Sequence, residues 1–161
     1  MIRPARAADA PALAALLNHW IEQTAVTFNP TPKTGDDIRE MILTKAAAGR
    51  AFLVAEDAGT IVGQASYGQF RSGAGYRTCM EHSISLLSGT PRKGLGRALL
   101  TAVEDHARTQ GAHQMIAGIS GENAEGQAFH ARMGYRLIAT IPEAGHKFGR
   151  YMDLVLMQKF L

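Results

Sequence analysis

The order in which the hydrophobic spacing changes along the chain is the feature that most limits its fold. Apolar residues recur at helical spacing over residues 13–20 and again over 38–42. Short apolar and β-branched runs, typical of strands, then follow at 51–56, 61–67 and 78–87. Two helices before three consecutive strands fit neither a strict alternation of strand and helix nor an all-β fold.

The second half of the chain adds both kinds of element. An apolar start at Ile2 supplies a first strand, and the later elements are a strongly amphipathic helix at 95–110, a strand at 114–119, a helix at 123–133 and strand-like runs at 135–141 and 151–158. The predicted order is βααβββαβαββ, which indicates an α/β fold with a mixed sheet. Because 161 residues carry no linker or composition shift, we expect one domain spanning 1–161.

Composition and charge exclude several classes of function. The net charge of +3 comes from Lys and Arg residues that are spread along the chain, so no nucleic-acid partner is expected. Cys79 is the single cysteine, which excludes an intramolecular disulfide, and without a Cys-x-x-Cys pair no metal site is expected. The segment Met1-Ile2-Arg3-Pro4 does not have the apolar stretch of a signal peptide, and no 18-residue apolar run is present, so we expect a cytoplasmic protein without a membrane partner.

The segment Arg92-Lys93-Gly94-Leu95-Gly96-Arg97 carries the clearest chemical signal. It follows a predicted strand and opens the amphipathic helix, so its glycines let backbone N–H groups approach a ligand at a positive helix end. It lacks the Walker pattern, and Leu99 stands where the dinucleotide fingerprint needs a third glycine. The expected ligand is therefore a phosphate-bearing molecule of another class.

This loop resembles the pyrophosphate loop of the GNAT superfamily of N-acetyltransferases, whose fold has the same element order. The segments 76–83 and 147–153 are similar to the phosphinothricin and methionine sulfone or sulfoximine acetyltransferase group, and the similarity spans nearly the whole chain. The resemblance implies an N-acetyltransferase that moves the acetyl group of acetyl-CoA directly to the amine of a small amino-acid-like substrate. It also implies a homodimer.

The resemblance implies a set of residues that bind acetyl-CoA. The backbone of the strand would pair with the pantetheine arm, the loop amides would hold the pyrophosphate, and an asparagine would lie near the cofactor; these residues are Ile84, Ser85, Leu86, Arg92, Lys93, Gly94, Leu95, Gly96, Arg97 and Asn123. Pro91 departs from the usual Gln or Arg at the first loop position. Since most bonds in such a loop come from main-chain amides, we expect the site to survive.

Glu81 and His130 are the predicted catalytic residues. Glu81 interrupts an apolar strand just before the cofactor segment, where a carboxylate could accept a proton from the attacking amine directly or through water. The alternative for Glu81 is a carboxylate that faces solvent on an edge strand. His130 stands where the resemblance places a residue near the CoA sulfur, so it could protonate or stabilise the leaving thiolate. A backbone N–H, that of Leu86, could stabilise the oxyanion.

The acceptor site is predicted from the same resemblance. Its residues are Arg71, Ser72, Gly73, Arg77, Glu81, His82 and Ser83, with Arg150 as a further cation for a substrate carboxylate. The alternative for His82 is a side chain that packs in the protein interior. Two other functions stay open: a GNAT enzyme for another amine, such as a protein N-terminus, a lysine or an aminoglycoside, and a non-catalytic CoA-binding module.

Overall fold

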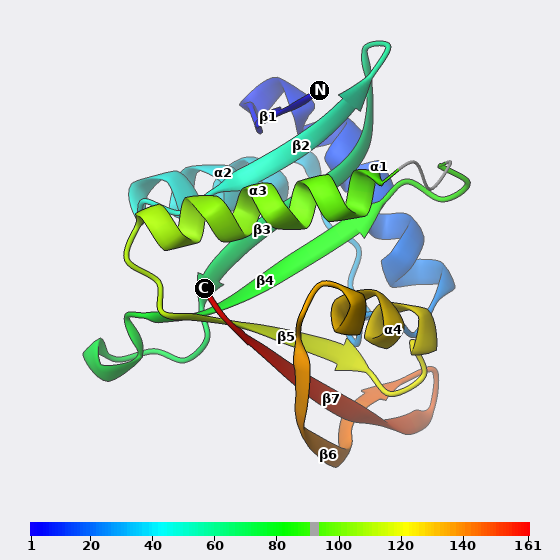
Figure 1. The fold of residues 1–161 in the computed structure, drawn as a ribbon. Coiled ribbons are helices and arrows are strands. Elements are labelled where there is room, and N and C mark those ends of the chain that lie inside the picture. Colours follow the sequence, from blue (N-terminus) through cyan, green and yellow to red (C-terminus); the bar gives the residue numbers. More distant parts are fainter. Residues whose placement is uncertain (91–93) are drawn as a thin grey trace.

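A computed structural model describes residues 1–90 and 94–161 of the chain. Within this part, seven strands form one mixed sheet in the order β1-β2-β3-β4-β5-β7-β6 (Figure 1). The strands are β1 (Ile2–Pro4), β2 (Phe52–Asp57), β3 (Thr60–Gln69), β4 (Cys79–Leu86), β5 (Gln114–Ser120), β6 (Arg136–Lys147) and β7 (Arg150–Phe160). All neighbours are antiparallel except β4 and β5, which are parallel.

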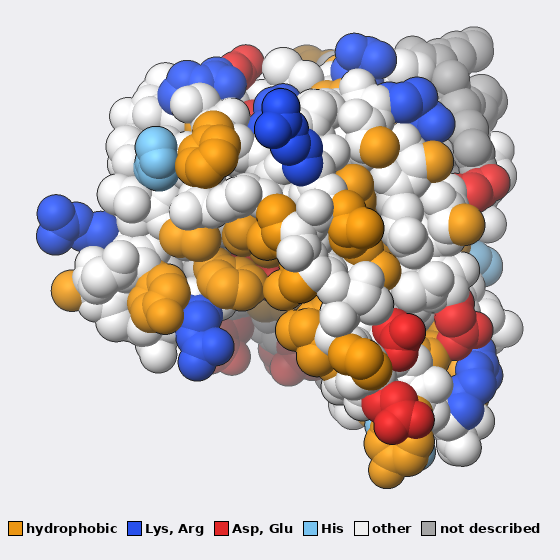
Figure 2. Space-filling view, turned by 60° about the horizontal axis from the view of Figure 1, so that its bottom comes forward, with side chains coloured by type: hydrophobic (Ala, Val, Ile, Leu, Met, Phe, Trp, Pro, Cys, Tyr) orange, Lys and Arg blue, Asp and Glu red, His pale blue; other side chains and the backbone are white. Residues whose placement is uncertain are grey.

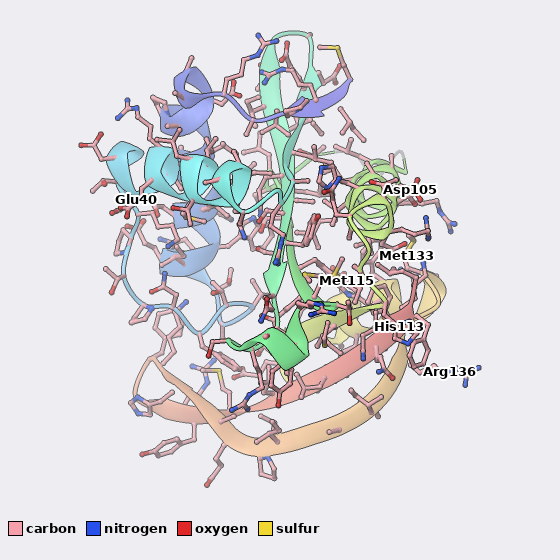
Figure 3. All side chains as sticks on the ribbon, turned by 90° about the vertical axis from the view of Figure 1, so that its left-hand side faces the viewer. Glu40, Asp105, His113, Met115, Met133 and Arg136 are labelled. Carbon is pink, nitrogen blue, oxygen red and sulfur yellow. The ribbon has the colours of Figure 1, made fainter. Side chains whose placement is uncertain are left out.

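Helices cover both faces of the sheet. They are α1 (Ala10–Gln23), α2 (Gly35–Ala47), α3 (Leu95–Thr109) and α4 (Ala124–Arg132), with short 3-10 turns η1 (Ala7–Asp9) and η2 (Ala74–Tyr76). Figure 3 views the sheet from its edge, with α1 and α2 on one side and α3 and α4 on the other. Glu40 of α2 and Asp105 of α3 point outward on opposite sides, whereas Met115 of β5 is buried between the layers.

The parallel pairing between β4 and β5 is short. It joins residues 79–81 to residues 114–116 and goes no further, although both strands continue. Beyond Glu81 the two strands diverge, and β4 then keeps a ladder only with β3, while β5 keeps its ladder with β7. The sheet is therefore open at its middle from Glu81 onward.

The main hydrophobic core lies between the sheet and α3. Leu99, Leu100 and Val103 of α3 have no exposed surface and pack with residues of β3, β5 and β7. A smaller core lies on the other face, where Leu13 of α1 and Ile38 of α2 cover β2. These two cores fix the helices against the sheet on both sides of the opening.

The predicted fold class and element order are confirmed, and the bounds differ mainly at the end of the chain. The strand predicted at 135–141 continues as β6 to Lys147, although Pro142 and Gly145 indicate a loop. Irregular pairing between Ile141 and Gly145 absorbs the extra residues. Phe148 and Gly149 then close a tight hairpin with positive φ angles of 53° and 72°.

The core assignment gives a direct stability test. Replacing Leu99 by Ala removes a fully buried side chain from the α3 layer, so we expect the free energy of unfolding to fall by about 2–5 kcal/mol. The matched control is Leu43→Ala on α2, where the side chain is 68% exposed and the expected change stays within about 0.5 kcal/mol. Chemical denaturation measures both, and equal losses would contradict the assignment.

Candidate active site

The two faces of β4 present different chemistry to the opening. Side chains alternate along a strand, so Glu81, Ser83 and Ser85 face the layer of α1 and α2. His82 and Ile84 face the layer of α3 and α4. The strand thus separates a polar side from a largely apolar side.

The backbone of β4 also offers unused hydrogen-bonding groups at the opening. Leu87 N–H donates to the carbonyl of Val62 on β3, at 2.9 Å. Because backbone groups alternate in direction, those of Ile84 and Leu86 point the other way, toward the space that β5 has left. On that side, the indole N–H of Trp20 donates to the Leu86 carbonyl at 2.8 Å. The N–H groups of Ile84 and Leu86 are therefore placed to pair with an extended ligand.

A first cavity of about 710 Å³ lies along this free edge, on the side of α3 and α4. Ile84, Ser85 and Leu86 line it together with Gly94, Leu95, Gly96 and Arg97 at the start of α3, Asn123 before α4, and Phe129 and His130 within α4. Gly94 caps α3 with a φ of 78°, a conformation that suits glycine. The described part of the predicted pyrophosphate loop thus meets the free strand edge in one cavity; Pro91, Arg92 and Lys93 lie outside the described residues.

Asn123 has a clear structural task at this cavity. Its side-chain oxygen accepts a hydrogen bond from the Gly126 N–H at 2.9 Å and caps α4. A Cβ atom at position 126 would stand 2.5 Å from the Asn123 amide nitrogen, so glycine makes the cap possible. The cap orients the first turn of α4 toward the cavity.

A second cavity of about 520 Å³ lies on the other side, under α1 and α2. Its floor consists of polar side chains from adjacent strands: Gln64 and Ser66 of β3, both buried, and Glu81, Ser83 and Ser85 of β4. Ile84, Ser85, Asn123 and His130 line both cavities, so the two spaces meet at the diverging strands.

The connection between α1 and α2 forms one wall of the second cavity, and it is fastened to the C-terminal hairpin. The buried Lys147 ammonium donates to the carbonyls of Thr24 and Thr27, at 2.7 and 2.9 Å. The Phe28 ring, which lines the cavity, fills the space where a side chain at Gly145 would stand. Residues far apart in sequence therefore hold this wall in place.

Glu81 is the single carboxylate among the described residues that line the second cavity. Its Oε2 lies 3.3 Å from the position that a Gly118 Cβ would take, so the carboxylate leans toward β5. The side chain is open to the cavity, yet surrounding protein atoms withdraw it from bulk water, and this burial raises the pKa of Glu81. A carboxylate with a raised pKa is suited to accept a proton near neutral pH.

His82 and His130 form a buried pair beside Glu81. Their rings stack with centroids 5.0 Å apart, and Tyr135 contacts both rings edge-on. Neither nitrogen of His82 has a hydrogen-bond partner among the described residues. Burial, with a smaller contribution from His130, lowers the pKa of His82 to about 3, so His82 is neutral in the folded protein.

The hydrogen bond of His130 determines which of its nitrogens carries a proton. Its Nδ1 lies 2.7 Å from the Gly126 carbonyl, which can only accept, so Nδ1 is the donor. The Nε2 atom is buried without a partner in the described structure, and burial lowers the pKa of the ring. Neutral His130 therefore presents a lone pair at Nε2 and has no proton there to give to a thiolate.

The remaining predicted acceptor residues lie outside both cavities. Arg71, Ser72, Gly73 and Arg77 sit on the exposed connection between β3 and β4, and none of them lines either cavity. The Arg150 guanidinium is paired with the Glu122 carboxylate at 2.9 and 3.2 Å on the surface. Of the acceptor set, the structure brings together Glu81, His82 and Ser83.

Sequence reasoning missed several cavity residues. Trp20 ends an apolar helical pattern that is typical of a core residue, but its side chain is half-buried and lines both cavities. Lys33 and Lys45 bring positive charge into the second cavity from the region of α2. The polar floor could be predicted from the sequence, because Gln64 and Ser66 alternate with apolar residues in their strand.

The chain is similar to known proteins over nearly its whole length. A family model described as an acetyltransferase (GNAT) domain matches residues 2–156. The chain is 39% identical to the L-amino acid N-acyltransferase MnaT of Escherichia coli, over 98% of this chain and 91% of that protein. It is also 39% identical to an L-methionine sulfoximine/L-methionine sulfone acetyltransferase of Pseudomonas aeruginosa, over 98% and 92%.

The fold is also similar to that of a solved structure with acetyl-CoA. The yncA protein of Salmonella typhimurium, determined with its cofactor acetyl-CoA, superposes with a TM-score of 0.96 at 37% identity, covering 100% of this chain and 93% of that one. In residues 1–90 and 94–161, no helix is long and apolar enough to cross a membrane. The same residues contain no group of three or more His, Cys, Asp or Glu side chains placed to hold a metal ion.

The neutral His82 gives a pH-dependent stability test. Since its pKa is lower in the folded than in the unfolded protein, the wild type should lose stability as the pH falls below about 6.5. His82→Phe keeps an aromatic ring without a titrating group, and we expect it to lose about 2 kcal/mol less than the wild type between pH 7 and pH 5.

Denaturant unfolding at the two pH values measures this difference. The control is His146→Phe, which makes the same change at an exposed position and should keep the wild-type pH dependence. If His82→Phe loses as much stability on acidification as the wild type, the buried neutral state of His82 is wrong.

Proposed function

The chain belongs to the GNAT family of acetyltransferases, and we propose that it transfers the acetyl group of acetyl-CoA to the primary amine of a small amino-acid-like acceptor. The acceptor class is that of methionine sulfone, methionine sulfoximine and phosphinothricin. The observation that carries this proposal is the second cavity, in which Glu81 stands over a polar floor next to the free edge of β4. We assign the activity to one domain that comprises residues 1–161.

The first cavity fits acetyl-CoA by its chemistry. The free edge of β4 can pair with acetyl-CoA as a further strand would, the N–H of Ile84 with the pantetheine arm and the N–H of Leu86 with the thioester oxygen. The start of α3, from Gly94 to Arg97, offers N–H groups and a guanidinium to the pyrophosphate. Arg92 and Lys93 lie outside the described residues, and we include them in this site on the basis of the sequence. When bound, acetyl-CoA supplies the thioester that the amine attacks.

Glu81 is the proposed general base. Its carboxylate faces the acceptor cavity and can take the proton from the ammonium form of the acceptor, directly or through one water. The pKa raised by burial keeps the carboxylate basic enough for this transfer at neutral pH. The N–H of Leu86 faces the opening and is the proposed donor to the oxyanion.

The proposed task of His130 follows from its tautomer. With Nδ1 bonded to the Gly126 carbonyl, its buried Nε2 has a lone pair and no partner in the described structure, so it could accept a hydrogen bond only from a donor that reaches it at the junction of the two cavities. We therefore assign His130 to orienting a donor there, and not to protonating the leaving thiolate.

A homodimer is part of the proposal. Large hydrophobic side chains are exposed on the outer hairpin of β6 and β7, with Leu137 63%, Ile138 50% and Tyr151 66% exposed. Figure 2 turns this side of the molecule forward and shows hydrophobic side chains gathered across its middle. Because β6 is also the edge of the sheet, a second copy is the partner that we propose for this surface.

An acceptor panel tests the proposed function. CoA release from acetyl-CoA, followed with a thiol reagent, should rise with methionine sulfone, methionine sulfoximine or phosphinothricin. It should stay at background with a lysine side chain in a peptide, a peptide with a free N-terminus and an aminoglycoside. Turnover confined to the last three would assign another amine, and acetyl-CoA binding without turnover on any amine would indicate a CoA-binding module.

Removing the base gives a sharper test of the mechanism. We expect Glu81→Gln to lower kcat by about a hundredfold or more while the affinity for acetyl-CoA is unchanged. The wild-type rate should fall as the pH drops through the raised pKa of Glu81, because the protonated carboxyl cannot accept a proton. This acidic limb should be absent in Glu81→Gln. A variant with wild-type kcat would exclude Glu81 as the base.

A further inference from the structure

Lys45 of α2 brings an ammonium group into the acceptor cavity. The side chain is half-buried, lines the second cavity and donates through Nζ to the Tyr67 carbonyl at 2.9 Å. Its nitrogen lies 3.5 Å from the position that a Gly68 Cβ would take. The ammonium thus lies in van der Waals contact with the side-chain position of residue 68, above the β3 backbone.

The position above Gly68 is directly across the ladder from Glu81. Gly68 and Glu81 are paired in the antiparallel register of β3 and β4, and paired residues project their side chains to the same face. Lys45 therefore stands on the face of the sheet from which Glu81 projects. The Glu81 carboxylate leans the other way, toward Gly118 on β5. Cation and carboxylate border the same space from two sides.

The Lys45 ammonium has no counterion in the described structure. No carboxylate of residues 1–90 and 94–161 forms an ion pair with it, and Glu81 is not within ion-pair distance. A lysine ammonium has three N–H donors, and the Tyr67 carbonyl takes one. Burial and the nearby Arg50 lower the pKa of Lys45, which shows that its charge is poorly compensated. An anionic group in the cavity would compensate the charge of the Lys45 ammonium.

An α-amino acid carries the two charges that complement this arrangement, since its ammonium and carboxylate are attached to one carbon atom. We propose that Lys45 binds the carboxylate of the acceptor and so directs the acceptor amine toward Glu81. This inference rests on the proposed amino-acid acceptor and names the residue that selects for it. Arg71 and Arg77, which the sequence suggested for this role, lie outside the cavity of this chain.

The test compares two acceptors that differ only in the carboxylate: methionine sulfone and 3-(methylsulfonyl)propylamine. Steady-state kinetics are measured for the wild type, Lys45→Met and Lys45→Arg. The matched control is Arg39→Met, which removes a cation from the same helix at an exposed site paired with Asp36. Each variant is compared with the wild type on the same acceptor, so the different basicities of the two amines cancel.

We expect Lys45→Met to raise the KM for methionine sulfone by about ten- to a hundredfold, because a half-buried charge pair loses one partner. The KM values for the carboxylate-free amine and for acetyl-CoA should change less than about threefold. Lys45→Arg, which keeps the charge, should recover much of the loss, and Arg39→Met should match the wild type.

Two results would overturn the assignment of Lys45 while leaving the proposed function intact. One is an equal rise in KM for both acceptors, which would indicate a purely structural role. The other is an unchanged KM for methionine sulfone. If Lys45→Met does not fold, the test of Lys45 rests on the KM values of Lys45→Arg and on the wild-type preference between the two acceptors. A wild type that acetylates only the carboxylate-free amine overturns both proposals.

Discussion

The end of strand pairing after Glu81 is the constraint on which the site depends. A parallel ladder between β4 and β5 would normally satisfy the backbone groups of both strands. Here the ladder stops at Glu81 and Ile116, and the strands are held apart by separate ladders to β3 and β7. The N–H groups of Ile84 and Leu86 consequently face a cavity. A binding site for an extended ligand thus follows from the sheet itself.

The alternation of side chains along β4 then divides the chemistry between two cavities. Glu81, Ser83 and Ser85 face the polar cavity under α1 and α2, while Ile84 and the buried His82 lie toward α3 and α4. The two spaces join at the diverging strands, where His130 lines both. One strand therefore presents the proposed base to one cavity and a hydrogen-bonding edge to the other, and this arrangement fits the proposed direct transfer without a covalent enzyme intermediate.

Much of the fold could be predicted because its signals are local. The capping box of Thr34 and Asp37, and the glycines at 111 and 134 with positive φ, mark element ends within a few residues of where they occur. Glu81 could be singled out because it breaks an apolar strand. Lys45 could not, since it belongs to a helix that packs on β2, and it is the last turn of that helix that brings the Lys45 side chain to the cavity. The tautomer of His130 could not be predicted from the sequence either, because it depends on a hydrogen bond to the Gly126 carbonyl.

Hydrogen exchange along β4, with and without acetyl-CoA, tests the central claim most directly. The amides of Ile84 and Leu86 face the opening, whereas Ser83 and Ser85 are already in the ladder with β3. We expect acetyl-CoA to slow exchange at Ile84 and Leu86 and at the start of α3, from Gly94 to Arg97, and to leave Ser83 and Ser85 nearly unchanged. Protection elsewhere, with Ile84 and Leu86 exchanging as before, would contradict the assignment of the diverging strands as the acetyl-CoA site.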